Sequence, residues 1–130
     1  MIRMSYIVLP RLNAFAGNRL EQSLAFLKEC GYDGVEFNIT EPLGIDVAVL
    51  ERLTQRHGLA IPSFLTGEAY ADGLCLCSPD ADIRRRTVER LISYLNTAQR
   101  FSAVLVVGLL QGQLRDEPDT PLANQRIAEG

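Results

Sequence analysis

Apolar residues along this chain fall into short continuous runs and into longer segments with helical spacing. The short runs predict four strands, at 5–9, 35–39, 60–65 and 103–107. The helical spacing predicts helices over 19–30, 46–58 and 79–100, with another helix beginning at Thr120-Pro121. Strands that alternate with helices lie parallel, because each helical crossover returns the chain to the same end of the sheet. The pattern therefore predicts an α/β fold of parallel (β/α) units.

Local signals mark the ends of these elements. Asp46 and Ser78 are the expected N-caps of two helices, and Pro79 follows at a first helical position. Segments 66–77 and 108–119 are expected to be loops. The fourth run is the most apolar and predicts a strand covered on both faces. The apolar face of the third helix is expected to contain Val88, Leu91, Leu95 and Ala98.

Parallel units of this kind close either as an open doubly wound sheet or as a barrel. The open sheet predicts a glycine-rich phosphate loop after the first strand, and Pro10-Arg11-Leu12-Asn13 follows that strand instead. A (β/α)8 barrel takes about 250 residues in eight units. The 130 residues hold about four units, so they are expected to form one partial domain, half of such a barrel.

Composition narrows the function classes. The chain is 47% hydrophobic, which excludes intrinsic disorder. Its apolar runs are too short to cross a membrane, and its start does not resemble a signal peptide. With 13 basic and 16 acidic residues, it offers no basic surface for nucleic acid. Three cysteines do not indicate a disulfide framework, so a cytoplasmic location is expected.

Several segments resemble one known family. Residues 24–36 resemble the first helix and second strand of the xylose-isomerase-like TIM barrels, which include sugar phosphate isomerases and epimerases and an apurinic/apyrimidinic endonuclease branch. Residues 78–86 and 104–112 look like the third helix, fourth strand and following loop of the same barrels. The chain departs from the family at Phe101-Ser102, where a Leu-Gly junction is common, and at Gln111, where several members carry arginine.

The resemblance implies a metal-dependent sugar isomerase or epimerase acting on a sugar or sugar phosphate. The family holds its divalent ion (Mn, Mg or Zn) with Glu, Asp and His side chains of the second half of the barrel, and no residue of this chain matches those positions. We therefore expect no cofactor bound by this chain alone and a metal only in a full-length barrel. The resemblance also implies that the chain is the N-terminal half of a TIM barrel, so the polypeptide is expected to be a fragment or half-barrel that is inactive alone, and no catalytic residue is assigned.

Four residues are candidates for substrate binding. Val35, Phe37 and Ile39 should face the helices, which leaves Glu36 and Asn38 on the interior face of the second strand. Glu68 and Gln111 come just after the third and fourth strands, where the active sites of barrels lie. The simpler interpretations are a structural carboxylate for Glu36 and solvated loop side chains for the others. Arg11 and Asn13, which follow the first strand, are weaker candidates.

Other chemically active side chains have structural explanations. His57 is the single histidine and falls in the last turn of a helix, away from the expected active face. Cys75 and Cys77 lack the further ligands that zinc needs and are expected to be small buried residues, while Cys30 is distant in sequence. The run 84–86 is expected to be a solvated basic face. Arg115 either meets a substrate hydroxyl or phosphate or, more simply, pairs with neighbouring acids.

Two further functions stay open. A half-barrel has two unpaired sheet edges and an open apolar interior, so the chain would also suit a non-catalytic assembly or binding module. We then expect a homo-oligomer or a complementary half as partner, or else a truncated product. The endonuclease branch is disfavoured, because Glu68 and Gln111 stand near the positions where its zinc-binding histidines are expected.

Overall fold

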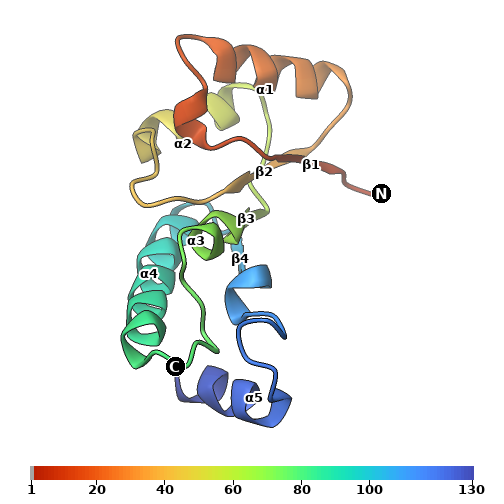
Figure 1. Cartoon of the computed structure of the whole chain (residues 1–130). Helices are drawn as coiled ribbons and strands as arrows, with labels where there is room; N and C mark the ends of the chain where they lie inside the picture. Colours follow the sequence, from red (N-terminus) through yellow and green to blue (C-terminus); the bar gives the residue numbers. More distant parts are fainter. Residues whose placement is uncertain (1) are drawn as a thin grey trace.

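A computed structural model describes residues 2–130 as one parallel sheet with helices between the strands (Figure 1). The strands pair in the order β1-β2-β3-β4, and their bounds are Ser5–Val8, Gly34–Asn38, Ser63–Leu65 and Val104–Val106. The long helices are α1 (Arg19–Glu29), α2 (Val47–Arg56), α4 (Ala81–Arg100) and α5 (Thr120–Glu129). Four parallel strands alternating with helices are the α/β pattern of half a TIM barrel.

The sheet has one covered and one uncovered face, and Figure 1 shows α1, α2 and α4 along one side of the strands. Val35, Phe37 and Phe64 point toward these helices and are fully buried, as are Leu24 of α1 and Leu50 of α2. Glu36 and Asn38 alternate with the buried residues of β2 and occupy the other face, which confirms the predicted division of this strand. The core therefore lies between sheet and helices.

Aspartate side chains begin three of the long helices. Asp46 accepts hydrogen bonds from the backbone N–H groups of Ala48 and Val49, which confirms its predicted capping role. The predicted cap of α4 was wrong: Asp80, not Ser78, accepts from the N–H of Asp82, and the helix begins at Ala81. The Ser78 hydroxyl instead accepts from the N–H of Asp80, so it stabilises the turn before the cap.

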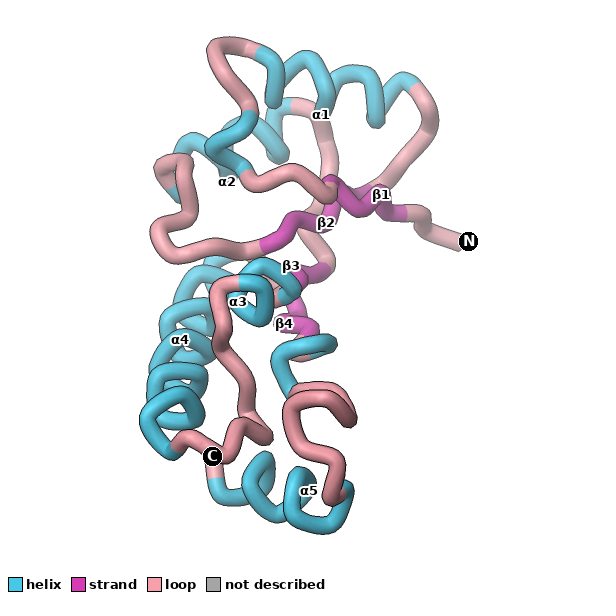
Figure 2. The backbone as a smooth tube through the Cα atoms, in the orientation of Figure 1, coloured by secondary structure: helices cyan, strands magenta, loops and turns pink. Residues whose placement is uncertain are grey.

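Two segments predicted to be loops contain short helices (Figure 2). Helix α3 (Gly67–Ala71) follows β3, and the 3-10 helix η2 (Gly108–Gln111) follows β4 and lies against α3. A third short helix, η1 (Leu12–Ala14), follows β1. One-turn helices carry almost no periodic signal, so packing rather than sequence pattern decides them. They lie after the carboxyl ends of the strands, where they shape the candidate site.

The structure also corrects two predicted apolar faces. Helix α4 buries Thr87, Tyr94 and Ala98, whereas Leu95 is 52% exposed. Strand β4 is not covered on both faces: Leu105 is half-buried, but Val104 is 64% exposed and Val106 is also exposed. The side chains of Val104 and Val106 lie on the uncovered face of the sheet, so an apolar sequence here marks an open surface and not a closed core.

Pro62 limits the third strand to three residues, because proline has no N–H for the sheet. Ala60 still pairs with Gly34 through an isolated bridge. Within residues 2–130, no helix is both long and apolar enough to cross a membrane.

Candidate functional site

The carboxylate of Glu36 lies at the centre of a polar cluster on the uncovered face of the sheet. Its two oxygens accept hydrogen bonds from Ser5 of β1 and Ser63 of β3. The sheet register explains the contact with Ser63. Phe37 of β2 pairs with Phe64 of β3, so the residues that precede them, Glu36 and Ser63, lie side by side on the opposite face of the sheet. One carboxylate therefore joins three neighbouring strands, and the structure brings a predicted site residue together with two serines that sequence reasoning did not single out.

Asn38 lies two residues further along the same face, at the carboxyl end of β2. Its amide nitrogen donates to the backbone oxygen of Leu9, just after β1, at 2.9 Å. Its side-chain oxygen faces Gly67 at the start of α3, where an added Cβ would lie 3.8 Å away. Asn38 thus spans the ends of the first three strands, and it lies nearer than Glu36 to the carboxyl end of β2.

An ion-pair network extends over the same end of the sheet. The Nε of Arg11, after β1, donates to Glu68 of α3 at 2.6 Å, and a terminal nitrogen donates to Asp72 at 3.3 Å. The hydrogen bonds to Glu68 and then to Asp72 raise the pKa of Arg11. Because β2 lies between β1 and β3, this network crosses the strand end that carries Asn38. The structure therefore joins Arg11 and Glu68, which are 57 residues apart in sequence.

A second network involves Tyr70 of α3. Its hydroxyl donates to Asp116 at 2.8 Å and accepts from Arg115 at 2.9 Å. The hydrogen bonds from Arg115 lower the pKa of Tyr70, but the bond to Asp116, burial and the negative charge of Asp116 outweigh them, so the pKa is raised. The simpler prediction for Arg115 was wrong: its guanidinium donates to the Tyr70 hydroxyl and lies 5.5 Å from the centroid of the Tyr70 ring, instead of pairing with an acid.

Gln111 does not join the other candidates. It is exposed at the end of η2 and borders a cavity of about 320 Å³ that is also lined by Cys77, Glu117 and residues of α5. Asn13 is likewise separate, because it packs against the turn at Gly44, where an added Cβ would lie 2.8 Å from the Asn13 Cβ. The candidate site therefore consists of Ser5, Glu36, Asn38 and Ser63 on the sheet, with Arg11, Glu68 and Asp72 at its edge.

The predictions for the buried cysteines and for His57 at the end of its helix are confirmed, whereas the run 84–86 is only partly a solvated face, because the half-buried Arg84 donates to the backbone oxygens of Ser78 and Pro79. His57 is the C-cap of α2, and its Nε2 lies 3.5 Å from Glu21 of α1. Cys75 and Cys77 are buried, and Cys30 is exposed at the end of α1. In the basic run, Arg85 pairs with Asp82 and Glu89 on the surface of α4. None of these residues belongs to the candidate site as defined above.

A single feature of the sequence could have identified each of Ser5, Ser63 and Asp72 as a residue of the candidate site. Ser5 and Ser63 are polar residues inside apolar strands, and alternation places Ser63 on the opposite face from Phe64. Asp72 is four residues from Glu68, a spacing that places two side chains on one side of a helical turn.

The donor set of this chain does not fit a divalent metal. Among residues 2–130, no three His, Cys, Asp or Glu side chains converge as a metal site would require. Glu36 accepts hydrogen bonds from two hydroxyl groups, and Glu68 and Asp72 share the single positive charge of Arg11. These side chains are arranged to accept hydrogen bonds and not to coordinate an ion.

Comparison with known proteins agrees with this architecture. Residues 24–130 match the family model of the xylose isomerase-like TIM barrel, and the match includes Glu36, Asn38, Glu68 and Gln111. A comparison with curated proteins found no match. Because the family match spans most of the chain and the sheet has the parallel order that the fold requires, the chain belongs to the xylose isomerase-like TIM barrel family.

Proposed function

We propose that this chain forms the substrate-binding wall of a sugar isomerase or epimerase barrel and that it has no isomerase activity alone. The observation that carries the proposal is the Glu36 carboxylate, held between Ser5 and Ser63 on the uncovered face of the sheet. Asn38 and the Arg11–Glu68–Asp72 network lie at the carboxyl ends of the same strands. Enzymes with the (β/α)8-barrel fold bind their substrates at this end of the barrel.

The chemistry of these groups suits a polyhydroxyl ligand. A sugar presents hydroxyl donors along its carbon chain, and a carboxylate can accept several hydrogen bonds. Each oxygen of Glu36 accepts one bond from a serine and has a further lone pair for a substrate hydroxyl. The Asn38 oxygen offers another acceptor. We assign Glu36 and Asn38 to substrate positioning, and Glu68 and Asp72 to the rim of the site.

The proposed partner is a second set of (β/α) units that covers the open face, either a complementary half or another copy of this chain. Ile7, Val104 and Val106 expose apolar side chains on this face. An apolar groove of about 840 Å³ also lies beside β1, against α1, and Phe26 and Tyr6 line it. Open strand edges and exposed apolar surface together favour association. Light scattering at micromolar concentration should show a dimer or larger species, and a monodisperse monomer would contradict this part of the proposal.

Substrate binding can be tested with the chain itself. In an NMR titration with ketoses, aldoses and their phosphates, we expect shifts at the amides of Glu36, Asn38 and Glu68. Glu36→Gln should weaken binding several-fold by removing the charge, whereas Glu29→Gln, at the exposed end of α1, should not. Shifts confined to α5, or an unaffected Glu36→Gln, would contradict the assignment.

Activity provides a separate test. A coupled isomerase assay with added Mn²⁺ or Mg²⁺ should give no turnover above background for the chain alone. Metal-dependent turnover would contradict the proposal that this half binds substrate without holding the metal, because it would require a metal site within this half.

The alternative function, a non-catalytic assembly module, would use the same exposed face. Sugar binding at Glu36 distinguishes the substrate-binding wall from such a module.

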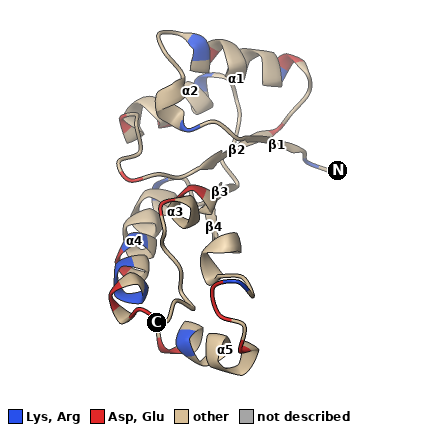
Figure 3. Cartoon of the chain, in the orientation of Figure 1, with Lys and Arg blue, Asp and Glu red and all other residues tan. Residues whose placement is uncertain are grey.

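Basic residues occur on α1, α4 and α5 and are interspersed with acidic ones (Figure 3), a distribution that does not favour the endonuclease alternative.

A further inference from the structure

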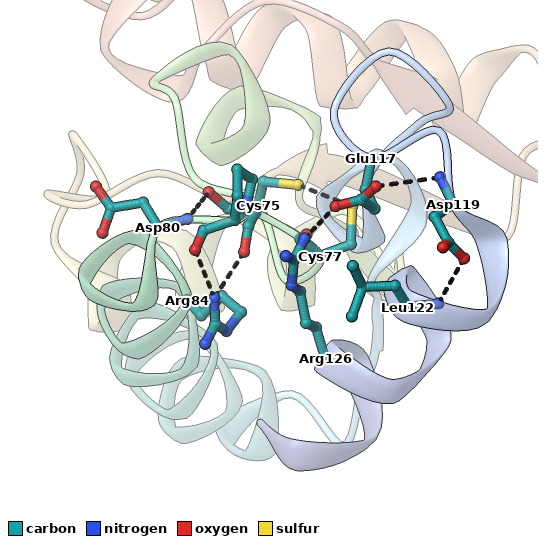
Figure 4. Close-up of polar contacts among 10 residues, drawn as sticks. Cys75, Cys77, Asp80, Arg84, Glu117, Asp119, Leu122 and Arg126 are labelled. Carbon is teal, nitrogen blue, oxygen red and sulfur yellow. Dashed lines mark hydrogen bonds and ion pairs between the residues drawn. The ribbon is translucent and has the colours of Figure 1, made fainter.

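Two thiols lie in contact in the segment between α3 and α4. Cys75 and Cys77 are 6% and 2% exposed, and their sulfur atoms lie 3.5 Å apart (Figure 4). Neither is part of the candidate substrate site. Such a separation is close to van der Waals contact, so one thiol can donate a weak hydrogen bond to the other. The pair therefore needs an explanation of its own.

The fold holds this segment from three directions. The N–H of Cys75 donates to the Thr87 hydroxyl of α4 at 3.0 Å, and the N–H of Leu76 donates to the Leu110 oxygen of η2 at 2.9 Å. Arg126 of α5 donates to the Cys77 oxygen at 3.2 Å. The contact between the sulfurs is thus imposed by tertiary structure, because each anchor comes from a different element.

Gly112, just after η2, packs directly over both sulfurs. Its φ is +105°, and an added Cβ would lie 2.1 Å from the Cys77 sulfur and 2.9 Å from the Cys75 sulfur. Only glycine fits this position without a shift of the loop or of the thiols. Any change in the bonding of the two sulfurs therefore acts on the loop at Gly112 and on its neighbour Gln111.

Each of the two cysteines also lines a pocket. Cys75 borders a cavity of about 300 Å³ together with Tyr70, Arg115 and Asp116. Cys77 borders the cavity of about 320 Å³ beside α5. Both volumes exceed that of a peroxide molecule, whose size is close to the roughly 30 Å³ of a water.

We propose that Cys75 and Cys77 form a redox modification site, in which a peroxide converts the dithiol to an intramolecular disulfide that loosens the loop at Gly112. Cys75 gives up its proton and its thiolate attacks a peroxide oxygen; the O–O bond breaks, a sulfenic acid forms, and the departing hydroxide takes up that proton to give one water. The second thiol then attacks the sulfenic sulfur, which releases the second water. The two sulfurs are oxidised by two electrons in total, and the peroxide oxygens are reduced.

The geometry favours a disulfide over metal binding. Closure requires the sulfurs to approach from 3.5 Å to a bond length of about 2.05 Å, which side-chain rotation and a small backbone shift can supply. A soft metal ion would need further ligands, and the described residues bring no third His, Cys, Asp or Glu to the pair. Closure also withdraws sulfur from its contact with Gly112, so the loop loses packing.

Peptide mapping tests the site. Trypsin cleaves after Arg56 and Arg84, so one peptide, 57–84, contains Cys75 and Cys77 and excludes Cys30. In the folded Cys30→Ser protein treated with hydrogen peroxide and then alkylated, we expect this peptide to be lighter by about 2 Da and unlabelled, and to be restored by dithiothreitol. Cys77→Ser should abolish the mass change. Oxidation of Cys30 in the wild type shows that the treatment was strong enough. If both thiols of the peptide are still alkylated after that treatment, or if the peptide gains oxygen atoms without forming a disulfide, the proposal is overturned.

Hydrogen exchange tests the effect on the loop. The Gly112 amide, bonded to Leu109, and the Leu76 amide, bonded to Leu110, should lose protection by at least about tenfold in the disulfide form. The Leu59 amide, bonded to Thr54 at the end of α2, is the internal control and should not change. Equal protection at Gly112 and Leu76 in the two redox forms would overturn the coupling. These readouts involve no sugar, so they are independent of the proposed function.

Discussion

The Ser63 hydroxyl of β3 donates a hydrogen bond to the Glu36 carboxylate of β2 across the uncovered face of the sheet. Ser63 is buried, whereas Glu36 is half-buried and has Ser5 as a second partner. Carboxylate oxygens that are partly withdrawn from water are stabilised when hydroxyl groups donate hydrogen bonds to them. The pair therefore stabilises the sheet, and under the proposed function it also holds Glu36 in place for a substrate.

Ser63→Ala should lower the free energy of unfolding by about 1 to 2 kcal/mol, because it removes a hydrogen bond to a charged group. Urea unfolding measures the change. In the Glu36→Gln background the same substitution should cost less, by at least about 0.5 kcal/mol, since the amide is a weaker acceptor. Equal costs in the two backgrounds would contradict the contact.

Asp46→Ala should lower the free energy of unfolding by about 1 kcal/mol, because two backbone N–H groups of α2 lose their acceptor. Thermal or urea unfolding measures it. Glu29→Ala, at the exposed end of α1, should change stability by less than about 0.5 kcal/mol. A cost no greater than that of this control would show that the cap is unimportant.

Gly112→Ala should destabilise the protein by more than about 2 kcal/mol, because its Cβ would overlap the Cys77 sulfur and φ would be unfavourable. Cys77→Ala removes that sulfur, so the double variant should be more stable than the sum of the two single changes predicts. Residual strain of about 1 kcal/mol from the backbone angle should remain. Purely additive effects would mean that the sulfur and the loop are not in contact.

The stability of the fold should fall in alkaline solution through Cys77. Burial, the hydrogen bond with Cys75 and the nearby negative charges raise the pKa of this thiol to about 11 from 9.0. The unfolded chain therefore releases the proton first, and stability that is complete below about pH 9 decreases until about pH 11.

The difference between the wild type and Cys77→Ser isolates this effect from the tyrosines that titrate in the same range. Over pH 9 to 11 the wild type should lose about 2 kcal/mol more free energy of unfolding than the variant. Parallel curves would contradict the raised pKa.

Sequence pattern predicted the strands and long helices because their signals are local. Val35 and Phe37 alternate with Glu36 and Asn38, and alternation alone assigns the two faces of a strand. Asp46 caps α2 through atoms two and three residues away. The same reasoning failed for β4, because an apolar run shows that a side chain avoids water but not whether another element covers it.

The site was predictable only in part. Glu36, Asn38 and Glu68 follow from strand alternation and strand ends, whereas Gln111 occupies an equivalent sequence position and is turned toward α5. The difference arises from η2, a one-turn helix that changes the direction of the chain after β4 and has too few residues to leave a periodic signal.

The sequence by itself determined the order of the elements, the covered side of β2 and the kind of fold, because these depend on neighbours within one or two turns. Tertiary structure alone decided which side chains meet. Ser63 reaches Glu36 across 27 residues and Arg11 reaches Glu68 across 57, while Gly112 covers two sulfurs from a distant loop. Such contacts depend on strand register and helix packing, which form only when the whole core is buried.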